Sequence, residues 1–169
     1  MNILLTSVGR RAYIIDYLRD VYKRLGLAGN IIATNSDMNT TAMSVADKAF
    51  ESPIIYDEKY IPFLLEICKS EKIDMLISLF DIDLMILAKN KRRFESQGVK
   101  VIVSDENIIN ICNDKFEMLK YLEKINMPVP MTYIDLEEAL KGVDFDKNSY
   151  ILKPRWGMGS LSIFEADNK

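Results

Sequence analysis

Short apolar runs alternate with longer amphipathic segments through the first hundred residues of the chain. The apolar runs predict strands over residues 3–5, 31–33, 75–77 and 101–103. Between them, hydrophobic residues recur at helical spacing, which predicts helices over 14–25, 60–67 and 81–94. This rhythm of strand and helix predicts a parallel sheet with helices on both faces, joined by right-handed crossovers. Because the strands are continuously apolar, we expect them to be buried on both sides.

The pattern changes after Ser104. A helix is predicted over 114–124, and the rigid extended segment Met127-Pro128-Val129-Pro130 follows it. Next come, in order, a strand at 131–134, a helix at 135–141, a turn-rich stretch at 142–149 and two strands that flank a glycine loop. We therefore predict two domains, the first over residues 1–112 and the second over 113–169.

Polar residues follow the predicted strands of the first domain, where ligands of parallel sheets bind. After the first strand, Gly9 and Arg10 precede a helix. Two interpretations stay open, a tight turn with a surface arginine, and an anion site formed by Arg10 with the helix N-terminus. Asp37, after the second strand, fits a loop-capping role better than contact with ribose hydroxyls, because the glycine pattern of dinucleotide sites is missing.

Two acidic residues, Asp81 and Asp83, begin the third long helix just beyond a strand end. Carboxylates in the first turn of a helix are expected from capping and from the helix dipole alone. Recognition of an amine-bearing substrate is the alternative interpretation.

Composition limits the classes of function. The formal net charge of −3 argues against bulk electrostatic binding to nucleic acid or to an anionic membrane. Apolar runs are too short for a membrane helix, and the chain opens directly on a strand without a signal-peptide pattern, so we expect a cytoplasmic protein.

The sequence contains no histidine, which nearly excludes zinc sites and histidine catalysis. Both cysteines, Cys68 and Cys112, fall in helical patterns and are predicted to be buried.

A lysine and a glycine loop carry the clearest chemical signal. Lys153 ends the apolar run of residues 150–152, and Gly157 and Gly159 follow within six residues. The lysine supplies a compact positive charge, and glycines let backbone N–H groups approach phosphate oxygens closely. Lys115 lies in the first turn of the helix that Asp114 is expected to cap, a slightly unfavourable place for a cation.

In order along the chain, Asp114-Lys115, Met127-Pro128-Val129-Pro130 and the segment from Ile151 to Ser160 resemble the opening of an ATP-grasp ligase. Residues 4–11 and 78–84 resemble the Rossmann-like domain that precedes it, most closely in proteins similar to the carbamoyl-phosphate synthase large subunit. The resemblance implies an α/β fold, in which a Rossmann-like parallel sheet is followed by an incomplete α+β lid subdomain of the ATP-grasp domain.

The resemblance also implies roles for individual residues. Lys115 and Lys153 would contact the ATP phosphates, and the loop of Gly157, Met158, Gly159 and Ser160 would close over them. The family uses ATP and Mg²⁺ to convert a carboxylate into an acylphosphate, which an amine or ammonia then attacks. Gly9, Arg10, Asp81 and Asp83 are the candidate substrate-binding residues. Trp156 has no assigned role.

The departure from the family concerns the metal-binding half. Only residues 164–169 follow the loop, so we expect the Mg²⁺ ligands outside this chain, in cis or in trans, and assign no catalytic residue or metal ligand within it. The chain alone is therefore expected to be inactive, as a truncated ligase or as the non-catalytic half of a split one. The alternative is a stand-alone Rossmann-like module that binds a small ligand. Exposed apolar surface on the unfinished lid favours self-association.

Overall fold

The computed structural model describes residues 1–144, 146, 148–157 and 159–167 and forms two compact units, Met1–Glu106 and Asn107–Lys169. We call them unit 1 and unit 2. The boundary predicted from sequence, between residues 112 and 113, stays a prediction. No helix in the described part of the chain is long and apolar enough to cross a membrane.

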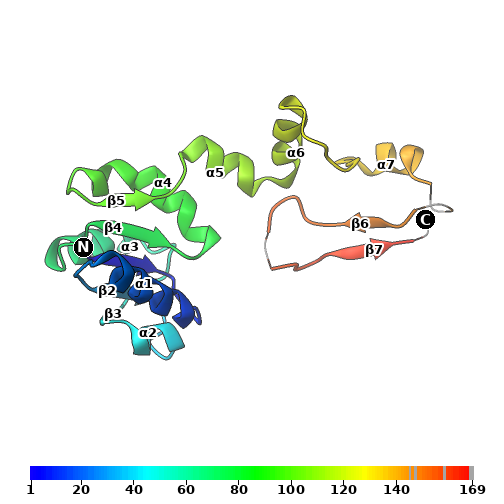
Figure 1. Cartoon of the computed structure of the whole chain (residues 1–169). Coiled ribbons are helices and arrows are strands. Elements are labelled where there is room, and N and C mark those ends of the chain that lie inside the picture. The colour runs from blue at the N-terminus through cyan, green and yellow to red at the C-terminus, as the bar shows by residue number, and fades with distance from the viewer. Residues whose placement is uncertain (145, 147, 158, 168–169) are drawn as a thin grey trace. The chain divides into compact units, whose positions relative to one another are not determined.

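Unit 1 is a five-stranded parallel sheet in the order β3-β2-β1-β4-β5 (Figure 1). Its strands are β1 (Ile3–Thr6), β2 (Ile31–Asn35), β3 (Lys48–Glu51), β4 (Met75–Ser78) and β5 (Lys100–Ile102). Its helices are α1 (Ala12–Leu25), α2 (Thr41–Val45), α3 (Tyr60–Ser70) and α4 (Asp81–Glu95), and α5 (Glu106–Asn113) begins at its last residue. The predicted α/β fold is confirmed.

Two hydrophobic clusters cover the two faces of the sheet, because successive side chains of a strand point to opposite faces. Ile3 and Leu5 of β1 pack in one cluster with residues of α1 and α2. Leu4 packs in the other, together with Leu64 of α3 and Phe94 of α4. The predicted strands and helices of this unit are confirmed, and α1 ends at Gly26 in the left-handed conformation that favours glycine.

Unit 2 contains α6 (Lys115–Lys124), α7 (Leu136–Gly142) and an antiparallel hairpin of β6 (Tyr150–Leu152) and β7 (Phe164–Ala166). The two predicted helices and the strands around the glycine loop are confirmed. The strand predicted at 131–134 is wrong, because this segment has no strand partner in the described part of the chain.

The prediction for the cysteines is half right. Cys68 on α3 is buried, whereas Cys112 on α5 is exposed. The physical reason is that α5 buries a single residue, Ile109, and leaves the rest of its surface in contact with solvent.

Candidate functional site

The carboxyl ends of the unit 1 strands surround a cavity of about 240 Å³. Its polar lining residues come from the loops that follow the first three strands, and they are Ser7, Gly9, Arg11, Asn35, Ser36 and Ser52. Apolar lining comes from Pro53, Ile55 and Phe80. Since parallel strands deliver their carboxyl ends to one edge, these loops meet where a doubly wound sheet binds its ligand.

A buried carboxylate lies beneath the same edge of the sheet. Asp83, in the first turn of α4, has no solvent exposure, and its oxygens accept three hydroxyl hydrogen bonds. Thr6 and Ser78 donate to Oδ2 at 2.8 and 2.9 Å, and Tyr60 donates to Oδ1 at 2.9 Å. Burial is the main cause that raises the pKa of Tyr60 far above its ordinary value, and the charge of Asp83 is the second. This network joins β1, β4, α3 and α4.

The substrate-binding residues predicted in unit 1 lie in different environments. Gly9 lines the cavity, and its N–H donates to Asn35 Oδ1 at 3.4 Å. Arg10 is exposed and is not a lining residue, whereas the next residue, Arg11, is. Asp81 is exposed at the start of α4, and Asp83 is enclosed by its hydroxyl partners. Asp37 caps its own loop by accepting the Asn39 N–H at 2.8 Å.

In unit 2 the structure brings Lys115 to the glycine loop. Asp114 caps α6, since its carboxylate accepts the N–H groups of Phe116 and Glu117. The Lys115 backbone N–H donates to the Arg155 carbonyl at 3.2 Å, and the Lys115 ammonium donates to the Gly157 carbonyl at 2.8 Å. Two segments that are more than forty residues apart in sequence therefore meet around one lysine.

Next to Lys115 lies an ion pair that was not predicted from the sequence. The Arg155 guanidinium binds both carboxylate oxygens of Asp114, with Nε at 2.8 Å from each and a second nitrogen at 2.6 Å from Oδ2. Hydrogen bonding from Arg155 is the main cause that lowers the pKa of Asp114 to about 2. The guanidinium also lies 4.7 Å from the Trp156 ring centroid, which gives Trp156 a contact within the loop. The sequence indicated the two partners only separately, as an arginine beside the glycine loop and an aspartate expected to cap a helix, and gave no sign that they pair.

The remaining loop residues follow β6. Lys153 is exposed and forms no hydrogen bond or ion pair with another described residue. Gly157 has a φ of +128°, which a side chain would disfavour, and Gly159 and Ser160 also have positive φ. Met158, predicted to belong to the loop, lies outside the described residues.

The described residues do not fit a magnesium site. Among them, no group of three or more acidic or cysteine side chains is arranged to hold a metal ion. Mg²⁺ prefers carboxylate oxygens, and the Asp114 carboxylate, which contacts Arg155 beside the loop, is already paired with that arginine. We therefore assign no metal ligand in this part of the chain.

A parallel sheet with helices on both faces and a polar cavity at its carboxyl edge defines unit 1 as a doubly wound α/β domain. Comparison with known families agrees. The model of the PylC-like N-terminal domain matches residues 3–102, and the ATP-grasp domain model matches residues 112–169. The chain belongs to the PylC-like N-terminal domain family and continues into an ATP-grasp domain. The resemblance to the N-terminal portion of an ATP-grasp ligase is thus confirmed.

Individual relatives share this architecture at low identity. The carbamoyl phosphate synthase large chain of Pseudothermotoga lettingae is 22% identical over 82% of this chain. The biotin carboxylase of Campylobacter jejuni was solved as a complex with βγ-ATP. It superimposes with a TM-score of 0.67 at 19% identity over 99% of this chain. The biotin carboxylase domain of Hydrogenobacter thermophilus 2-oxoglutarate carboxylase, a dimer with MgADP and bicarbonate, has a TM-score of 0.63 at 20% identity over 97%. The chain spans 12%, 38% and 37% of these proteins, respectively.

Proposed function

We propose that this chain is the N-terminal part of an ATP-dependent ligase that joins a carboxylate to an amine or to ammonia through an acylphosphate. The observation that carries the proposal is the hydrogen bond from the Lys115 ammonium to the Gly157 carbonyl. It joins a cation to a glycine loop in a segment that matches the ATP-grasp domain. Phosphoryl transfer is mostly positioning and charge neutralisation, which lysines and backbone N–H groups provide without histidine.

In this proposal the ATP phosphates contact Lys115 and Lys153, and the loop of Gly157, Met158, Gly159 and Ser160 covers them. The exposed Lys153 ammonium, which no described residue binds, supports a contact with an external anion. ATP is bound with Mg²⁺, whose ligands we place outside this chain because the described residues do not fit them. The chain alone is then catalytically incomplete, and a further part supplies the other half of the site in cis or in trans.

The carboxylate substrate is proposed to bind at the carboxyl edge of the unit 1 sheet. Of the residues predicted there (Gly9, Arg10, Asp81 and Asp83), Gly9 lines the cavity and Asp83 holds the strands beneath it. The protein is proposed to act in the cytoplasm without nucleic acid or membrane partners, which agrees with the net charge and the two free cysteines. Exposed Trp156, Leu161 and Phe164 support self-association or docking of the missing half.

A second candidate function rests on the cavity itself. A doubly wound unit with a polar cavity at its carboxyl edge can bind a small ligand without the second unit. Under this alternative the chain is a ligand-binding module, or the non-catalytic half of a split ligase, and Lys153 contributes nothing to the binding of the ligand.

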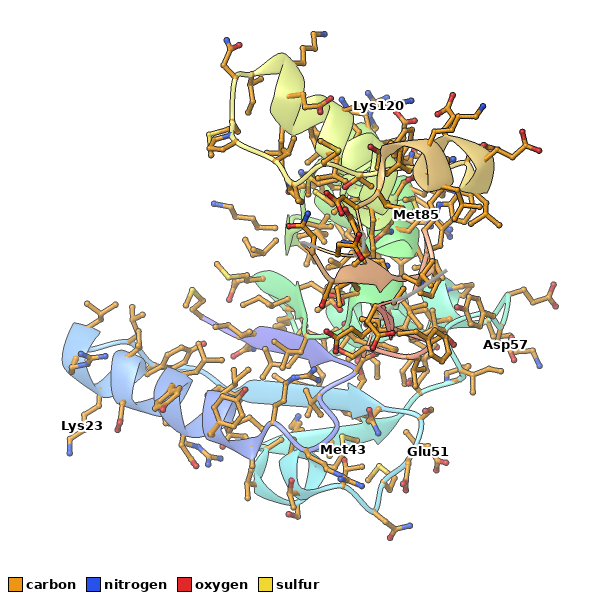
Figure 2. All side chains as sticks on the ribbon, turned by 90° about the vertical axis from the view of Figure 1, so that its right-hand side faces the viewer. Lys23, Met43, Glu51, Asp57, Met85 and Lys120 are labelled. Atoms are coloured by element: carbon orange, nitrogen blue, oxygen red, sulfur yellow. The ribbon has the colours of Figure 1, made fainter. Side chains whose placement is uncertain are left out.

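Binding of MgATP to the ¹⁵N-labelled chain, followed by NMR, tests the proposal. We expect weak binding, with shifts at the amides of Lys115, Gly157 and Gly159. Lys115→Ala and Lys153→Ala should each weaken it by about 10-fold or more, since a hydrogen bond to a charged group contributes about 1.5–3 kcal/mol. Lys120→Ala is the matched control, because Lys120 (labelled in Figure 2) lies on α6 over the Phe116 ring and forms no hydrogen bond or ion pair with a described loop residue.

Two other results would point elsewhere. ATP turnover by the chain that is abolished by Lys153→Ala would contradict catalytic incompleteness. Tight nucleotide binding that survives both lysine substitutions would favour the ligand-binding module instead.

A further inference from the structure

The cavity of unit 1 has a positive lining that is not neutralised by the protein. Among the residues that the structure describes, Arg11 is the one charged residue that lines it, and no acidic residue does. Arg11 is half-buried as a residue, and its guanidinium forms no hydrogen bond or ion pair with another described residue. A guanidinium that lines a cavity without a counter-charge favours binding of an anion.

The start of α1 adds hydrogen-bond donors beside Arg11. The helix has 14 residues, no acidic residue in its first turn and no side-chain hydrogen bond at its N-cap, Arg11. Within the part of the chain that the structure describes, the N–H groups of Ala12 and Tyr13 have no backbone acceptor. The positive end of the helix dipole is therefore left open to an external acceptor.

Ser52 gives an independent indication of a ligand. The residue follows β3 directly after Glu51 (labelled in Figure 2), is only 9% exposed and lines the cavity. Its hydroxyl forms no hydrogen bond with another described residue. No fully buried side-chain oxygen or nitrogen in the described residues lacks a partner, so the Ser52 oxygen keeps some accessible surface on a residue that lines the cavity. A nearly buried hydroxyl on a residue that lines a cavity is a donor available to a bound molecule.

We propose that this cavity binds the carboxylate or phosphate group of a small molecule, with Arg11 as its cation and Ser52 as a hydroxyl donor. A volume of about 240 Å³ accommodates one end of a metabolite. Binding of an anion in this cavity does not depend on the proposed ligase function. The identification of this anion as a substrate does rest on it. The proposal assigns the anion to Arg11 and not to the neighbouring Arg10, whose role in an anion site was one of the two interpretations left open by the sequence.

The test is a titration of the ¹⁵N-labelled chain with inorganic phosphate and, separately, with acetate. We expect saturable shifts at the amides of Gly9, Ala12 and Ser52, and the ion that binds more tightly identifies the head group. Arg11→Gln should weaken binding at least 10-fold and Ser52→Ala several-fold. Arg24→Gln is the matched control, because it removes the same charge from the last turn of the same helix.

Each result decides the proposal. Saturable shifts that are lost in Arg11→Gln and kept in Arg24→Gln support it. No saturable shift with either ion overturns it, and so does binding that is equal in the two arginine variants. The same spectra separate the two proposals, because MgATP shifts at Lys115 and Gly157 report on the ligase function, whereas ion shifts at Gly9 and Ser52 report on the cavity alone.

Discussion

In the described part of the chain, each unit has one buried carboxylate, Asp83 in unit 1 and Asp114 in unit 2, and the two are bound by different kinds of partner. In unit 1, Asp83 is completely buried and is bound by three hydroxyl groups from β1, β4 and α3, with no cation. In unit 2, Asp114 is also largely buried, at 8% exposed, but it is bound by an arginine and by the backbone N–H groups that it caps. Among the described residues, all buried hydrophobic side chains except Ile109 belong to unit 1.

This difference indicates where each unit obtains its stability. The strands of unit 1 are fixed by burial on both faces, and the hydroxyl network adds a specific link between their ends. The hairpin of unit 2 leaves Ile151, Leu152 and Phe164 exposed, so polar contacts carry a larger share of its organisation. We therefore expect unit 2 to open at a lower free energy than unit 1.

The largest expected effect is that of Asp83→Ala. Loss of the carboxylate leaves the buried hydroxyls of Thr6 and Tyr60 without this acceptor, whereas Ser78 can still donate to the Phe80 carbonyl at 3.2 Å. We expect the free energy of unfolding of unit 1 to fall by about 3 kcal/mol. Urea denaturation followed by circular dichroism measures the change. Asp81→Ala, in the same helical turn but exposed, is the control and should cost less than about 1 kcal/mol through the helix dipole. Equal losses for the two variants would mean that the network does not stabilise the unit.

Tyr60→Phe should have an intermediate effect that depends on pH. At neutral pH it removes one hydrogen bond to a carboxylate, which we expect to cost about 1.5–3 kcal/mol. Because the pKa of Tyr60 is raised in the folded state, the unfolded chain loses this proton first, and the contribution of Tyr60 declines as pH rises above about 10. The difference in unfolding free energy between parent and variant should therefore shrink above that pH. Burial also raises the pKa of Cys68 to about 12, but this thiol is common to both proteins and cancels. A difference that stays constant up to pH 11 would contradict the prediction.

The smallest effect is expected at the ion pair of Arg155 with Asp114 in unit 2. The Arg155 guanidinium holds the pKa of Asp114 at about 2, so Arg155→Gln should raise it toward the ordinary value of about 3.9. Since the pKa is lowered in the folded state, the stabilisation by this pair is fully present above about pH 4 and is lost as pH falls through about 2. Carboxyl ¹³C NMR titration measures the shift. Glu117→Gln is the control, because Glu117 contacts Arg155 only at 3.5 Å and should leave the Asp114 pKa nearly unchanged.

Sequence periodicity predicted most of the fold but missed β3, α2 and α5. The edge strand β3 carries charged residues at both ends, Lys48 and Glu51, and so lacks the continuous apolar run of the central strands. The helix α2 has five residues, too few to show a helical period. The segment 131–134 shows the converse error, because an apolar run becomes a strand only when a partner strand pairs with it.

The sequence by itself determined the features that depend on neighbouring residues. The main strands and helices, the Asp114 cap and the glycine loop between two strands all follow from spacing over a few positions. Only the tertiary structure decided which side chains meet, namely the three hydroxyls with Asp83, Arg155 with Asp114, and Arg11 in place of Arg10 at the cavity. The physical reason is that local periodicity fixes the backbone of each element, whereas side-chain partners depend on how packing brings together elements that are distant in sequence.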